Sequence, residues 1–127
     1  MGDRANIVIE ADKNMFPHPV FFYTHWSGYK IMPTLKAALI RGKERWDDAQ
    51  YLSRVIFCEL VGNDSGGVTG FGITTKIGDG GGNLLCVNME EKKVRERSSR
   101  EDIKAPIIKE WTFDEFIALK FKEQEED

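Results

Sequence analysis

Two strand-like segments near the start of the chain constrain the fold most, because they lie close enough in sequence to pair. Residues 20–26 read Val-Phe-Phe-Tyr-Thr-His-Trp and are rich in the aromatic and β-branched side chains that favour strands. Residues 5–11 alternate, with Ile7 and Ile9 on one face and Val8 on the other. Turn-forming residues separate the two segments, so we expect a wide antiparallel hairpin.

A first helix is predicted after this hairpin, between Tyr29 and Gly42. Leu35, Ala38 and Leu39 have the i, i+3, i+4 spacing of a buried helix face. Pro33 suits the first turn of a helix, where its missing N–H has no partner to lose. Gly42 is a typical residue after a helix end.

A second helix is predicted from Asp47 to Gly62. Asp47 is expected to cap its N-terminus, with Gln50 as the partner three residues later. Residues 51–60 carry an apolar stripe that includes one acid, Glu59, and Cys58 is expected to be a buried structural thiol.

The C-terminal half is predicted to hold three strands and a short helix. Residues 68–77 alternate, and residues 84–89 and 92–97 continue as strands, so these three are expected to form a meander. The segment 107–111 is expected to be extended. Thr112 and Glu115 fit a capping box that opens a helix reaching Phe121.

The predicted order is β-β-α-α-β-β-β-α, which indicates an α+β fold. We expect an antiparallel sheet of about five strands with three helices packed on one face. Residues 1–122 are expected to form one domain, and residues 123–127 an acidic tail. The bare glycine face of residues 70 and 72 and an open meander edge predict a homo-oligomer.

Composition limits the function classes more than it selects one. The 127 residues carry 18 basic and 21 acidic side chains, a net charge of −3, which disfavours a nucleic acid polymer as partner. No segment is apolar and long enough for a membrane span, and none resembles a signal peptide. The two cysteines read as buried thiols of a reducing compartment, which predicts a cytoplasmic protein without a metal or other cofactor.

The end of the second predicted strand is the first candidate site. Alternation places Tyr23, His25 and Ser27 on one face and Trp26 on the other. An aromatic ring beside a histidine suits stacking on a planar base and hydrogen bonding to its edge. The alternative is a set of core aromatics with a hydrogen-bonded histidine at the rim of the sheet.

Two further segments could hold an anion. Arg45 beside Trp46 could clamp one next to a stacked ring, or the segment could be a solvated loop with Trp46 on the core. Thr74 and Lys76 continue the glycine face as hydroxyl and ammonium donors, or that face could pack tightly on a helix. The glycine-rich run 78–83 matches no phosphate-binding motif and is expected to be a hairpin tip.

Several short motifs carry a family resemblance over roughly residues 1–90. They are Met-Gly-Asp-Arg-Ala-Asn at 1–6, Tyr-Thr-His-Trp-Ser-Gly at 23–28, Arg-Trp-Asp-Asp at 45–48 with Tyr-Leu at 51–52, and Thr-Gly-Phe-Gly-Ile at 69–73. The chain resembles a family of short proteins from phages and bacterial genomes. It also resembles viral sponge proteins that sequester the cyclic nucleotides of bacterial anti-phage signalling (CBASS).

The resemblance to sponge proteins implies a non-enzymatic homo-oligomer, with a tetramer as its expected form, in the cytoplasm of the host. It implies a cyclic dinucleotide ligand such as cyclic GMP-AMP. The resemblance supplies no binding-residue motif, so the site residues rest on side-chain chemistry. Bases are expected to stack on Tyr23, His25 or Trp26. The phosphates are expected to be held by Arg4, Arg45, Thr74 and Lys76.

Two other function classes remain open from the sequence. One is a small hydrolase acting on a nucleotide or an amide, with His25 and either Glu59 or Asp47 as acid and base. The missing nucleophile and metal motifs count against it. The other is an inhibitor that blocks a host factor through a sheet edge or an exposed aromatic patch.

Overall fold

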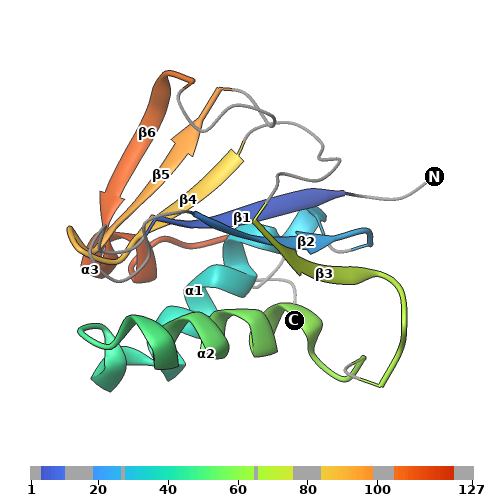
Figure 1. Ribbon diagram of the computed structural model, residues 1–127. Coiled ribbons are helices and arrows are strands. Elements are labelled where there is room, and N and C mark those ends of the chain that lie inside the picture. Colours follow the sequence, from blue (N-terminus) through green and yellow to red (C-terminus); the bar gives the residue numbers. More distant parts are fainter. Residues whose placement is uncertain are drawn as a thin grey trace.

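A computed structural model describes residues 4–10, 19–26, 28–64, 66–75, 84–98 and 105–121. The described residues form one six-stranded sheet with helices on one of its faces (Figure 1). The strands are β1 (Ala5–Glu10), β2 (Val20–Thr24), β3 (Phe71–Thr74), β4 (Leu84–Asn88), β5 (Lys93–Arg97) and β6 (Ile107–Thr112). The helices are α1 (Ile31–Arg41), α2 (Ala49–Val61) and α3 (Phe113–Ile117), with single 3₁₀ turns at Gly28–Lys30 and Lys43–Arg45.

The strand order is β3-β2-β1-β4-β5-β6, which confirms the α+β class and corrects the sheet within it. The predicted antiparallel pair of β1 and β2 is confirmed, with Ile7 opposite Phe22. The segment 107–111, expected only to be extended, is a sixth strand, and β1 pairs with β4 in parallel, so the sheet is mixed.

The predicted meander of the third, fourth and fifth strands is wrong. β3 pairs with β2, and Ile73 lies opposite Phe22. The physical reason lies in β1, whose Ile7, Val8 and Ile9 have no exposed surface. A strand that is apolar on both faces belongs in the middle of a sheet, with a neighbour on each side. β4 fills that second side, which separates it from β3.

The helix boundaries are set by caps, most of them at the predicted residues. α1 is followed by Gly42, and α2 by Gly62 at a φ of +61°, a left-handed conformation that favours glycine. The expected cap of α2 is shifted by one residue: Asp48, not Asp47, accepts a hydrogen bond from the Tyr51 amide. The capping box of Thr112 is confirmed, but α3 is five residues long and does not reach residue 121.

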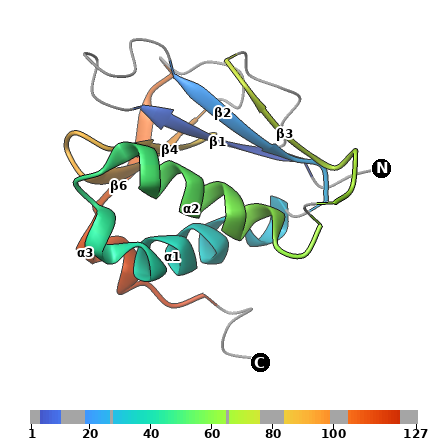
Figure 2. The ribbon, with the colours of Figure 1, turned by 60° about the horizontal axis from the view of Figure 1, so that its bottom comes forward.

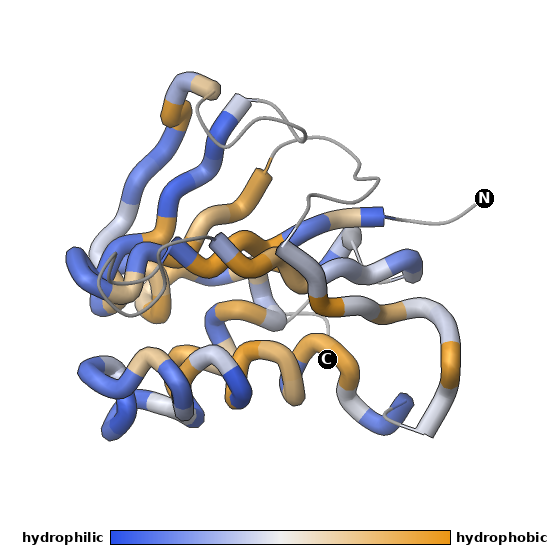
Figure 3. The backbone as a smooth tube through the Cα atoms, viewed as in Figure 1, coloured by the Kyte–Doolittle hydropathy of each residue, from blue (hydrophilic) through white to orange (hydrophobic). Residues whose placement is uncertain are grey.

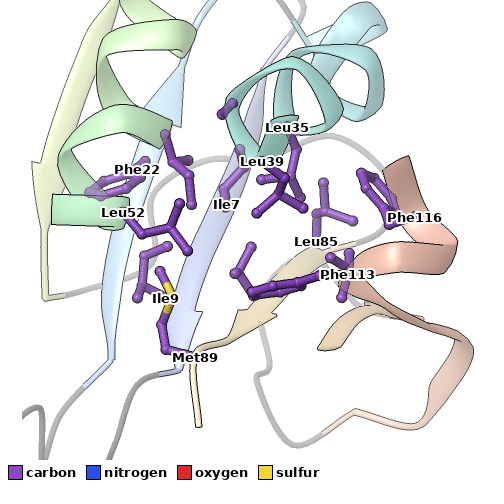
Figure 4. Packing of buried hydrophobic residues seen from close by; sticks show 14 of the residues in the cluster. Ile7, Ile9, Phe22, Leu35, Leu39, Leu52, Leu85, Met89, Phe113 and Phe116 are labelled. Atoms are coloured by element: carbon purple, nitrogen blue, oxygen red, sulfur yellow. The ribbon is translucent and has the colours of Figure 1, made fainter. Parts of the chain in front are cut away.

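The main core lies between the sheet and the helices, with α1 and α2 side by side across the sheet (Figures 2 and 4). Ile7 and Ile9 from β1, Leu35 and Leu39 from α1, and Phe113 from α3 are all fully buried in it. Hydropathy follows this arrangement: β1 and β4 are apolar, whereas β5 and β6 are largely hydrophilic (Figure 3). All three helices therefore pack on one face, as predicted.

The opposite face of the sheet has a smaller buried cluster of Val8, Phe21, Leu84 and Cys86. Burial, followed by the nearby charge of Glu10, raises the pKa of the Cys86 thiol to about 12. The prediction of a buried thiol is confirmed for Cys86 and is wrong for Cys58, which is exposed on α2. Both cysteines are free thiols.

Candidate functional site

An exposed tryptophan lies against a glycine at one corner of the sheet. A Cβ atom built on Gly70 would lie 2.1 Å from a ring carbon of Trp26, so the indole ring covers the α-carbon directly. The edge contacts of Trp26 are to Phe71 and His25, each at 5.9 Å between ring centroids and near perpendicular. One face of the indole is thus occupied, yet the residue remains 49% exposed. This geometry leaves the indole available as a stacking surface.

The backbone around this ring is held at two points. The amide of His25 donates to the Gly70 carbonyl at 2.8 Å. The amide of Trp26 donates to the Thr24 hydroxyl at 3.3 Å. The backbone that carries the indole is therefore held by the chain itself, which lowers the entropic cost of binding to the ring.

Two polar side chains contact the same ring nitrogen of His25. Arg4 Nε donates to His25 Nδ1 at 3.2 Å, and the Tyr23 hydroxyl lies 3.1 Å from the same nitrogen. A guanidinium can only donate, so Nδ1 acts as the acceptor, and the proton of the ring is assigned to Nε2. The imidazole is then neutral and offers an N–H donor beside the Arg4 cation.

Strand pairing explains why residues so far apart in sequence meet here. Ala5 lies opposite Thr24, and Thr24 lies opposite Phe71. The residues just outside these three strand ends are Arg4, His25 and Gly70. We call Arg4, Tyr23, His25 and Trp26 the corner cluster. All four are among the site residues predicted from the sequence.

Thr74 lies on the same face of the sheet as Tyr23. It pairs with Phe21 on β2, and Tyr23 is the next residue of β2 with its side chain on that face. Lys76, the other donor predicted on this strand, lies outside the described residues, as does Ser27. Thr74 is level with Phe21, four residues along the chain from His25, so β3 places it on this face of the sheet but away from His25 and Arg4.

Arg45 and Trp46 lie at the other end of the sheet. Asp47, the next residue, pairs with Lys92 at 2.7 Å in the turn between β4 and β5. That turn adjoins the last residue of β1, whereas Arg4 precedes its first. A strand of six residues is about 20 Å long. One site cannot include both groups on a single copy of the chain.

The local contacts of Arg45 and Trp46 are structural. The Arg45 guanidinium lies over the Tyr51 ring at 5.1 Å from its centroid. Trp46 donates its indole N–H to the Leu39 carbonyl at 3.0 Å and contacts the Phe113 ring edge-on at 5.1 Å. Trp46 thus joins α1 to α3 and extends the core, the alternative left open from the sequence.

The acids that a hydrolase would need are occupied elsewhere. Glu59 on α2 pairs with Arg41 on α1 at 3.0 Å, and Asp47 pairs with Lys92. His25, on the opposite side of the sheet from the helices, contacts neither of them among the interactions of the described residues. In the same part of the chain, no group of three His, Cys, Asp or Glu side chains is placed to hold a metal ion.

A pocket of about 380 Å³ lies next to the corner cluster, between the C-terminal half of α2 and the segment that leads into β3. The sequence does not indicate this pocket, because none of the residues that line it belongs to a recognisable binding motif. Phe71 is the link, since it lines this pocket and contacts Trp26. An unusually exposed cysteine, Cys58, also lines it.

Comparison with known proteins gives no match, whether to a family model, to a curated protein or to a solved structure. Among the helices of the described ranges, none combines the length and apolar character that crossing a membrane would take.

Proposed function

We propose that the chain binds a nucleotide at the corner cluster and does not cleave it. The observation that carries this proposal is the placement of a fixed, half-exposed indole beside an Arg4–His25 pair. Stacking of a base on an aromatic side chain contributes about 1–3 kcal/mol. A charge-assisted hydrogen bond from a guanidinium to a phosphate contributes about 1.5–3 kcal/mol.

The cluster offers separate contacts for the two halves of a nucleotide. The open face of Trp26 suits the base, which needs only a flat apolar surface. Arg4 is exposed, and the planar, forked guanidinium matches the geometry of phosphate oxygens, so its chemistry suits a phosphate. The Nε2–H of His25 is a neutral donor beside Arg4.

Binding without cleavage is favoured over hydrolysis by what surrounds His25. Its Nδ1 accepts from Arg4 and is close to Tyr23, and no carboxylate contacts it among the described interactions. A general base is usually oriented by a carboxylate or a carbonyl at its second nitrogen.

The resemblance to cyclic-nucleotide sponges supports a cyclic dinucleotide, such as cyclic GMP-AMP, as the ligand. Such a ligand has two bases and two phosphates, so a homo-oligomer could supply a second copy of the cluster. We accordingly propose a homo-oligomer, a tetramer by resemblance, that acts in the cytoplasm where these signals are made.

Calorimetric titration with a panel of cyclic dinucleotides tests this function. We expect saturable binding of at least one of them and recovery of intact ligand after the protein is denatured. Trp26→Ala should weaken binding about 5- to 150-fold, the loss of one stacked base. Tyr51→Ala is the matched control, because Tyr51 is 50% exposed and lies on α2.

Two results would remove the proposal. The first is the absence of binding across the panel, which would turn attention to a protein partner for the exposed ring. The second is recovery of a cleaved product, which would favour the hydrolase.

A further inference from the structure

The pocket between α2 and β3 has the size and shape of a small-molecule site. Its volume of about 380 Å³ falls in the range of roughly 300–1,000 Å³ that is usual for ligand pockets. We call it the α2–β3 pocket. Its lining residues are Phe57, Cys58, Val61, Gly62, Asp64, Gly67, Thr69 and Phe71.

Two aromatic residues line the α2–β3 pocket, and the ring of each contacts another aromatic ring. Phe57 lies on α2 one turn before Val61, so both side chains share one helix face. The Phe57 ring contacts Phe22 of the core at 5.1 Å between centroids. Phe71 enters from β3 and is supported by Trp26. These rings suit a flat aromatic ligand more than a branched aliphatic one.

Asp64 is the one charged residue among the described residues that line the α2–β3 pocket. Among the described lining residues, no lysine, arginine or histidine balances this carboxylate. The backbone of Asp64 is held in place, since its amide donates to Val61 at 3.2 Å and its carbonyl accepts from Gly67 at 3.0 Å. A carboxylate has two acceptor oxygens and no donor. The pocket therefore selects a ligand that donates and disfavours a phosphate.

We propose that the α2–β3 pocket binds a planar aromatic ring that carries two neighbouring N–H donors. The ring would pack against the aromatic lining of Phe57 and Phe71, and the two donors would meet the two oxygens of Asp64. The Watson–Crick edge of guanine, with its ring N–H beside an exocyclic amine, has this pattern without a charge. An aryl amidine has the same pattern with a positive charge.

This site is distinct from the corner cluster and does not depend on the function proposed for it. The corner cluster presents a cation and neutral donors, whereas the α2–β3 pocket presents a carboxylate. A probe without a phosphate, such as guanosine, therefore tests the pocket alone. A nucleotide that bound only at the corner cluster would leave the pocket empty.

The two cysteines supply a built-in reporter of pocket occupancy. Cys58 is exposed and lines the α2–β3 pocket, whereas Cys86 is fully buried and its pKa is raised to about 12. Iodoacetamide, a small neutral reagent, should thus modify Cys58 and spare Cys86 in the folded protein. A ligand in the pocket should protect Cys58.

The experiment measures the rate of Cys58 alkylation against the concentration of guanosine, inosine or benzamidine. Guanosine and benzamidine should slow the reaction saturably. Inosine lacks the exocyclic amine and should bind about tenfold more weakly, the usual loss for one hydrogen bond to a charged group. Protection by benzamidine alone would assign the pocket to cationic ligands, and protection by both would assign it to the shared donor pattern.

Asp64→Asn keeps the shape of the side chain and should weaken guanosine binding about tenfold or more. Glu44→Gln, an exposed acid in the turn after α1, is the matched control and should change nothing. Calorimetric titration with guanosine measures the same affinity without the thiol, and an unchanged melting temperature shows that Asp64→Asn folds. No binding of either guanosine or benzamidine to the native chain, or equal binding to Asp64→Asn, would overturn the proposal.

Discussion

The Trp26 indole and the α-carbon of Gly70 are in direct contact, and a methyl group at position 70 would overlap the ring. The nearest ring carbon would be 2.1 Å away, and the φ of Gly70 is +98°, where other residues are strained. Gly70 therefore fixes the indole of the corner cluster by having no side chain.

Gly70→Ala should displace Trp26 and weaken nucleotide binding as strongly as Trp26→Ala does. The positive φ adds a cost of about 1–2 kcal/mol to the folded chain, so the melting temperature should also fall. Gly66→Ala is the control, because nothing lies within 4 Å of a Cβ atom there. Nucleotide affinity that is unchanged in Gly70→Ala would show that the position of the indole does not matter for binding.

An ion-pair network joins β6 to the sheet and predicts a pH dependence of stability. Arg95 on β5 donates to Glu110 on β6 at 2.5 Å and also pairs with Glu91. The hydrogen bond from Arg95 lowers the pKa of Glu110 below its ordinary value of 4.5. Because the pKa is lowered by folding, ionised Glu110 stabilises the fold above pH 4.5, and this contribution is lost as the pH falls through the lowered value.

Glu110→Gln should therefore lower the free energy of unfolding at neutral pH and have a diminishing effect in acid. Denaturant unfolding of the native chain and the variant, at several pH values, measures this difference. Glu44→Gln should show no such trend. A difference between native chain and Glu110→Gln that stays constant through the acid range would contradict the role of this pair.

The outer edge of the sheet at β6 predicts self-association. Ile107 and Ile108 are 43% and 50% exposed on β6, which is the last strand in the order of the described sheet. An exposed apolar edge strand is a common site of pairing between chains. Light scattering should then give a mass above the 14.5 kDa of one chain.

Ile108→Lys should shift this assembly toward the single chain, because a charge on an edge strand opposes pairing. Ile40→Lys is matched in exposure, at 50%, but lies on α1 and should leave the mass unchanged. A native chain that stays at 14.5 kDa at every concentration would exclude the oligomer.

Local signals in the sequence predict most of the helices and strands. They do not predict which strands lie next to one another in the sheet. The alternation in β1, the glycines after α1 and α2 and the capping box of Thr112 are all properties of a few adjacent residues. The pairing of β1 with β4 joins Ile7 to Leu85, and no nearby residue indicates it. The predicted meander is wrong for the same reason: β3 and β4 are consecutive in the sequence but are not neighbours in the sheet.

The candidate site divides in the same way. Tyr23, His25 and Trp26 are consecutive or nearly so, and their chemistry could be recognised together. Arg4 lies beside this group and contacts His25, because the pairing of β1 with β2 brings the two residues together. Arg45 is predicted as a site residue from its residue type alone. Its distance from the corner cluster depends on how α2 packs on the sheet. The α2–β3 pocket lies between the end of a helix and the start of a strand that begins ten residues later. No short sequence motif indicates such a pocket.

The central claim is that Arg4, and not Arg45, holds a ligand phosphate beside Trp26. Calorimetric titration of the best-binding cyclic dinucleotide into Arg4→Ala and Arg45→Ala compares the two arginines directly. Loss of a charge-assisted contact should weaken binding to Arg4→Ala about 10- to 150-fold, with partial recovery in Arg4→Lys. Arg45→Ala should bind as the native chain does. Unchanged affinity in Arg4→Ala, or a loss confined to Arg45→Ala, would contradict the account.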